Sequence, residues 1–196
     1  MSLFAAFLLA AQPAPATSLP DPAAAAGDRA LLDAFRQVCE KVTDWNQLST
    51  AASQSGWQVF DEAANPQLAR INRIGREAVG TEGRMLGTSF RRTLAGRTVF
   101  LVVSRWEGAR GIWGNGCRLY DFTAAAPVNR DLLVAWMGRA PTGNQSFGQA
   151  GSNLLWEPGW RDGLTVSVNH VPATSAFRER YGLSGNVLVA QALGGI

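Results

Sequence analysis

The chain has 196 residues, of which 46% are hydrophobic and 17% are charged. This length suits one globular domain with a proper hydrophobic core, and the composition excludes the polar, highly charged class of chains that stay unfolded. The net charge is +3, and seventeen of the eighteen basic residues are arginine.

Charge is unevenly distributed along the chain. Residues 21–62 hold seven acids and three basic residues, whereas residues 70–118 hold ten arginines and three glutamates, a balance of +7. A basic surface of this kind attracts phosphate, anionic lipid, an acidic glycan or an acidic protein. The alternative, which we favour, is that the acidic segment folds against the basic one and neutralises it.

The N-terminal residues have the character of a secretion signal. Residues 3–11 form an apolar run of signal-peptide length that is too short to span a bilayer, and residues 14–16 are small enough for a signal peptidase site. We therefore expect a signal peptide over residues 1–16, a disordered Pro/Ala-rich lead-in over 17–27, and one globular domain over 28–196. The expected location is periplasmic or secreted, with no transmembrane helix in the mature protein.

Cys39 and Cys117 are the only cysteines. An even pair in an exported chain usually forms a disulfide in the oxidising compartment, so we expect these two to be bonded. The alternatives are a reactive thiol and a metal site. Neither cysteine has a partner at CxxC spacing and no histidine is nearby, so no metal site is expected.

Apolar residues recur at helical spacing over residues 28–42 and 44–56, with Asp44 as the N-cap of the second segment. A third helix is expected from Pro66 to Gly80, because proline is favoured at the first helical position and glycine after the last. Its outer face carries three arginines, Arg70, Arg73 and Arg76.

Beyond residue 80 the apolar period changes to two, which indicates antiparallel strands joined by hairpins. The predicted strands cover residues 89–94, 98–106, 117–122, 153–156, 164–171 and 186–193, and further helices cover 128–137 and 175–181. Residues 98–106 are apolar on both faces and belong in the middle of a sheet. Residues 139–152 lack periodicity and are predicted to form a long surface loop. The fold class is α+β, with a mainly antiparallel sheet of five to six strands and three to four helices packed on one face.

No strong catalytic motif is present. His170, the sole histidine, lies in a predicted strand, and the sequence contains no GxSxG motif around any serine. We therefore favour a structural role for His170 over one as a catalytic base. The glycine-rich segment 108–116 lacks the phosphate-binding patterns and is better explained as a hairpin connection. Two carboxylates can hydrolyse a glycoside without histidine, and Asp121 and Glu107 are the candidates for that chemistry. No cofactor is expected.

Three of the seven tryptophans lie in predicted loops or turns, namely Trp113, Trp156 and Trp160. Aromatic rings in loops can stack on sugars, bases or acyl chains. The alternative, which we favour, is that they cap the hydrophobic core or pair across a hairpin. Arginine with aromatic residues also fits single-stranded nucleic acid, but export argues against that partner.

The chain contains three short motifs, Phe35-x-x-x-Cys39, Ala52-x-x-x-Gly56-Trp57 and Cys117-Arg118-Leu119-Tyr120-Asp121. Together they resemble a pattern found in small, functionally uncharacterised exported proteins of Gram-negative bacteria. The resemblance covers residues 35–122 and implies a two-cysteine, exported, α+β architecture. It supplies no catalytic residues.

The sequence thus favours an exported, periplasmic protein that binds a ligand rather than transforming it. The expected contact residues are the three arginines of the third helix together with Arg110 and Trp113, and the expected ligand is an anionic envelope component or a protein partner. The alternatives are a carboxylate-dependent hydrolase using Asp121 and Glu107, and a structural or inhibitory partner protein. The oligomeric state is left open.

Overall fold

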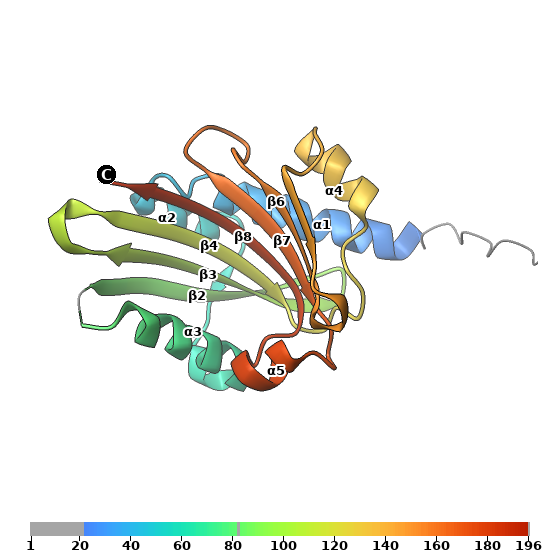
Figure 1. The fold of residues 1–196 in the computed structure, drawn as a ribbon, viewed down its shortest axis with the longest axis horizontal. Helices are drawn as coiled ribbons and strands as arrows, with labels where there is room; N and C mark the ends of the chain where they lie inside the picture. The colour runs from blue at the N-terminus through green and yellow to red at the C-terminus, as the bar shows by residue number, and fades with distance from the viewer. Residues whose placement is uncertain (1–21, 82, 196) are drawn as a thin grey trace, which may run out of the picture.

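The computed structural model describes residues 22–81 and 83–195. The predicted signal peptide, residues 1–16, and the first part of the predicted lead-in lie outside the described residues. In the described part, eight strands form one antiparallel sheet in the order β1-β2-β3-β4-β8-β7-β6-β5 (Figure 1). None of the helices in this part is long and apolar enough to cross a membrane.

The elements follow one another in a mixed α and β order. The strands are β1 (Gln58–Val59), β2 (Arg84–Leu94), β3 (Arg97–Glu107), β4 (Trp113–Asp121), β5 (Gly143–Ser146), β6 (Ser152–Trp156), β7 (Thr165–Val171) and β8 (Gly185–Gly194). The α-helices are α1 (Pro22–Cys39), α2 (Trp45–Gln54), α3 (Pro66–Val79), α4 (Arg130–Met137) and α5 (Ala176–Tyr181). Short 3-10 turns are η1 (Glu62–Ala64), η2 (Ala109–Gly111) and η3 (Gly148–Ala150).

Helices cover both faces of the sheet, with α1, α2 and α4 on one side and α3 and α5 on the other (Figure 1). Alternate residues of β3 serve the two sides, because successive side chains of a strand point in opposite directions. Leu101 and Val103 join the larger core under α1, α2 and α4. Phe100 and Val102 join a smaller core with Leu68 of α3.

The expected number of strands and the expected layering are therefore wrong. Residues 22–81 and 83–195 form eight strands rather than five to six, and five α-helices on two faces rather than three to four on one. A central strand that is apolar on both sides, as residues 98–106 are, has to be covered on both sides. Strand β5 lies inside the predicted loop 139–152. It was missed because it is a short, polar edge strand fixed by its pairing to β6 rather than by an apolar period.

Several helix boundaries follow the local signals. The Asn65 side chain accepts a hydrogen bond from the backbone N–H of Leu68 at 3.0 Å, Pro66 begins α3 and Gly80 follows its last residue. Helix α1, by contrast, begins at Pro22, so residues 22–27 of the predicted lead-in are helical.

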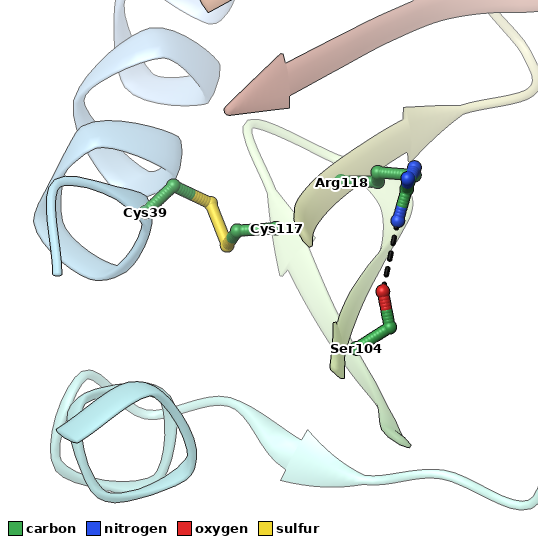
Figure 2. Close-up of a disulfide and its surroundings, with 4 residues drawn as sticks. All are labelled: Cys39, Ser104, Cys117 and Arg118. Carbon is green, nitrogen blue, oxygen red and sulfur yellow. Dashed lines mark hydrogen bonds between the residues drawn. A yellow bond between two sulfur atoms is a disulfide. The ribbon is translucent and has the colours of Figure 1, made fainter. Parts of the chain in front are cut away.

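The predicted disulfide between Cys39 and Cys117 is present and joins the last residue of α1 to the middle of β4 (Figure 2). Both cysteines are fully buried, and their Cα atoms are 5.4 Å apart. The bond ties the helical layer to a central strand of the sheet. An intramolecular disulfide is compatible with an oxidising, exported location.

Trp156 and Trp160 belong to the core rather than to an exposed binding surface. Trp156 is fully buried. The Trp160 ring packs 5.7 Å from that of Phe35 and 5.4 Å from that of Trp136, measured between centroids. These contacts agree with the interpretation that the tryptophans cap the core.

Candidate ligand-binding cleft

Each of the three arginines predicted as contacts on α3 has a partner within the chain. Arg70 donates to two backbone carbonyl oxygens of α5, at 2.8 and 2.9 Å. Arg73 and Glu77 form an exposed ion pair one helical turn apart, with 3.7 Å between Nε and Oε1. Arg76 donates to Glu62 at 2.7 Å. Arg70 and Arg76 therefore attach α3 to the segments beside it.

The other two predicted contact residues lie elsewhere. Arg110 is exposed in η2, at the tip of the β3–β4 hairpin. Trp113 packs against the larger core, with the guanidinium of Arg105 5.1 Å from the centroid of its ring. Because α3 covers the opposite face of the sheet, the structure does not bring the five predicted residues into one surface.

The two carboxylates considered for hydrolysis are far apart. Glu107 pairs with Trp113 at the start of β4, whereas Asp121 is the last residue of the same strand. Eight residues of strand correspond to about 26 Å, and the paired carboxylates of glycosidases lie about 5 to 10 Å apart. Asp121 instead accepts from Arg97 at 3.0 Å and Glu107 accepts from Arg105 at 2.8 Å. This pair therefore cannot share one glycosidase site.

Two adjoining chambers form a cleft on the face of the sheet that carries α3 and α5. The larger chamber has a volume of about 530 Å³ and lies between η1, α3 and strands β2 to β4. The smaller chamber has a volume of about 310 Å³ and lies between η3, α5 and strands β4, β8 and β7. Both volumes are in the range of small-molecule sites. Three residues line both chambers, Ile71, Arg118 and Tyr120.

The larger chamber has a polar wall whose groups satisfy one another. Glu62 accepts hydrogen bonds from Arg76 at 2.7 Å and from Asn72 at 2.5 Å, and Asn72 also donates to the hydroxyl of Ser89 at 3.2 Å. Burial acts to raise the pKa of Glu62, but the two hydrogen bonds and the charge of Arg76 outweigh it, so the pKa lies below its ordinary value. Glu62 is consequently charged, and each of its two carboxylate oxygens accepts a hydrogen bond.

Arg118 lies at the junction of the chambers. It follows Cys117 in β4, so the disulfide lies on one side of the strand and the arginine side chain on the other (Figure 2). Its neighbours on the adjacent strands are Val102 and Val189. One guanidinium N–H donates to the hydroxyl of Ser104 at 2.9 Å, and the described residues offer the Arg118 side chain no other hydrogen bond and no ion pair. Since a guanidinium has five N–H donors, most of them remain for a ligand.

Gly116 gives the Arg118 side chain its place on the sheet. A Cβ atom at this position would lie 2.5 Å from Nη1 of Arg118 and 3.0 Å from the hydroxyl oxygen of Ser104. A larger residue would therefore push the guanidinium away from its present position.

The smaller chamber is mostly apolar and holds one formal charge. Its apolar walls include Phe147, Phe177, Leu183, Val187 and Val189. Among the described residues that line it there is no aspartate or glutamate, and Arg118 is the only arginine or lysine. A negatively charged group beside Arg118 would thus meet a cation without a competing carboxylate.

Tyr120 lies beside Arg118 at the same junction and is buried. Burial raises the pKa of Tyr120, while the charge of Arg118 acts in the opposite direction. The phenol therefore stays neutral at physiological pH.

His170 is held by a hydrogen bond within the sheet, between its Nδ1 and the side-chain oxygen of Asn186 at 3.0 Å. Within residues 22–81 and 83–195, no group of three or more His, Cys, Asp or Glu residues is placed to hold a metal ion.

The chain matches no family model, no curated protein and no solved structure. The fold and the cleft establish a structural class. The protein is an α+β protein with helices on both faces of an antiparallel sheet and a two-chamber cleft lined by Arg118. Sequence reasoning missed Arg118 as a site residue. The available signal was strand alternation, which places it on the face opposite the buried Cys117.

Proposed function

We propose that this protein is an exported binding protein that holds an anionic component of the cell envelope in its cleft, with Arg118 in contact with the anion. The observation that carries the proposal is the Arg118 guanidinium, which lies in a cleft of ligand size. Among the described residues its one hydrogen-bond partner is the hydroxyl of Ser104. A guanidinium with free N–H groups recognises carboxylate or phosphate through two parallel hydrogen bonds.

The periplasm is the proposed compartment. The disulfide between two fully buried cysteines supports an oxidising location. The signal-like N-terminal sequence and the resemblance of three motifs to exported proteins of Gram-negative bacteria point the same way.

The hydroxyl groups of the cleft favour binding over chemistry. Among the residues that the structure describes, three serines line the cleft. Ser104 is hydrogen-bonded by the guanidinium of Arg118 and Ser89 by the side-chain amide of Asn72. Ser152 is the cross-strand neighbour of His170, whose Nδ1 is hydrogen-bonded to Asn186 instead. A serine nucleophile needs a general base hydrogen-bonded to it. None of the three serines has such a base among its hydrogen-bond partners in the described part of the chain.

Titration calorimetry with inorganic phosphate, acetate and octanoate tests the proposal. We expect at least one of these anions to bind saturably and to lose about 10- to 100-fold in affinity on Arg118→Gln, the range for one hydrogen bond to a charged group. The matched control is Arg73→Gln, which removes the same charge from the exposed outer face of α3. Equal affinity of wild type and Arg118→Gln for every anion that binds would refute the assignment.

A further inference from the structure

The smaller chamber has exposed aromatic walls. Phe147 and Phe177 are 50% and 40% exposed, and both line this chamber, one from the segment preceding η3 and the other from α5. Large apolar side chains gathered around a concave surface commonly mark a binding site. The two rings thus frame an opening into an apolar space.

The floor of the smaller chamber is also apolar. Val187 and Val189 of β8 face it, together with Leu183 from the segment before β8 and Ile71 from α3. These residues come from two separate segments of the chain, α3 and residues 183–189. A ligand in this chamber would exchange water for hydrocarbon contacts over most of its surface.

The charge that lines the smaller chamber is positive and comes from Arg118. Arg118 stands at the inner boundary of the apolar walls, and its neighbours across the sheet are valines on both sides. Two carboxylates in the described part of the chain line the larger chamber beside it: Asp61 accepts from the backbone N–H of Ala63, and Glu62 accepts from Arg76 and Asn72. The charge of Arg76 is thus balanced by Glu62, and Arg118 is the one arginine lining the cleft that has no carboxylate partner among the described residues.

Resting on the proposed function, we infer that the ligand is an amphipathic monoanion. Its alkyl or acyl chain occupies the smaller chamber between Phe147 and Phe177, and its headgroup, a carboxylate or a phosphodiester, contacts Arg118. One cation with free donors matches one anionic headgroup, and the apolar walls match a hydrocarbon chain. A small, fully hydrated anion would leave these walls exposed to water.

A chain-length series tests the inference. The probes are linear carboxylates from acetate to dodecanoate, with the 1-alkanol and the methyl alkyl phosphate diester of matched length, titrated into the folded, oxidised protein. We expect the dissociation constant of the carboxylates to fall by about fourfold per added methylene, the ratio for burial of one CH₂, until the chain fills the chamber. The phosphate diesters report whether the headgroup preference extends beyond carboxylate, and each alkanol is expected to bind at least about tenfold more weakly than its carboxylate.

Two variants separate headgroup from chain. Phe177→Ala changes a partly exposed wall residue and should weaken octanoate binding severalfold while leaving acetate unchanged. Arg118→Gln should remove the preference for octanoate over 1-octanol. Val59→Ala is the matched control, because Val59 is an exposed apolar residue of the edge strand β1 that does not line the cleft.

The outcomes distinguish the two proposals. If acetate binds as tightly as dodecanoate and Arg118→Gln abolishes both, the amphipathic ligand is wrong and the anion site stands. If alkanols bind as tightly as carboxylates, the chamber accepts chains but Arg118 does not select an anion, so both proposals are wrong. Absence of binding by every member of the series overturns both as well.

Discussion

Removal of the disulfide should destabilise the protein by an amount set by the length of chain that it closes. Cys39 and Cys117 are separated by 78 residues. Loop-closure entropy for that length gives about 4.5 kcal/mol at 25 °C. Both cysteines are fully buried in the larger core, so the double substitution Cys39→Ala/Cys117→Ala introduces no polar group there.

Urea unfolding at pH 7, followed by tryptophan fluorescence and extrapolated linearly to water, measures the difference. With a slope of about 2 kcal/mol per molar urea, the midpoint should fall by about 2 M. Wild type unfolded in the presence of a reducing agent is the control and should approach the double variant. A double variant within about 1 kcal/mol of the oxidised wild type would show that the crosslink does not restrict the unfolded chain as reasoned here.

Three further substitutions test separate parts of the structure. Arg97→Leu leaves the carboxylate of Asp121, which is fully buried, without its ion-pair partner. The free energy of unfolding measured in urea should fall by roughly 3 to 5 kcal/mol. A fall of less than about 1 kcal/mol would contradict this. Because the folded-state pKa of Glu62 is lowered, its stabilisation is complete above the unfolded value of 4.5 and is lost as pH falls through the folded value. Glu62→Gln should reduce the loss of unfolding free energy between pH 4.5 and lower pH. The same pH dependence in wild type and variant would contradict the lowered pKa of Glu62. Gly116→Ala should displace the flexible end of Arg118, weakening octanoate binding with less than about 1 kcal/mol change in unfolding free energy; unchanged affinity would argue against the guanidinium as the contact.

Helix ends and the crosslink could be predicted because their signals are local or compositional. The Asn65-Pro66 pair and Gly80 bound α3 as expected, since capping depends on a few adjacent residues. The pairing of the only two cysteines left one possible intramolecular bond. The apolar pattern on both faces of residues 98–106 also predicted a central strand correctly. The same pattern requires cover on both faces of the sheet, whereas the helices were predicted on one face only.

The cleft could not be predicted because it is assembled from distant segments. Its walls include Ile71, Arg118, Phe147 and Phe177, which come together only when the sheet and the helices beside it are in place. The arginines counted in the basic segment likewise have different surroundings. Arg76 is neutralised by Glu62 from an acidic part of the chain, whereas Arg118 has no carboxylate partner in the described part of the chain. Sequence composition gives the charge of both but cannot tell them apart.

A crystal structure of the oxidised protein with decanoate tests anion recognition at Arg118 most directly. The prediction is a carboxylate oxygen within hydrogen-bonding distance of the Arg118 guanidinium, with the alkyl chain lying between Phe147 and Phe177. Decanoate bound instead at the exposed arginines of α3 or of η2, with the smaller chamber filled only by water, would contradict both the role of Arg118 and the amphipathic ligand.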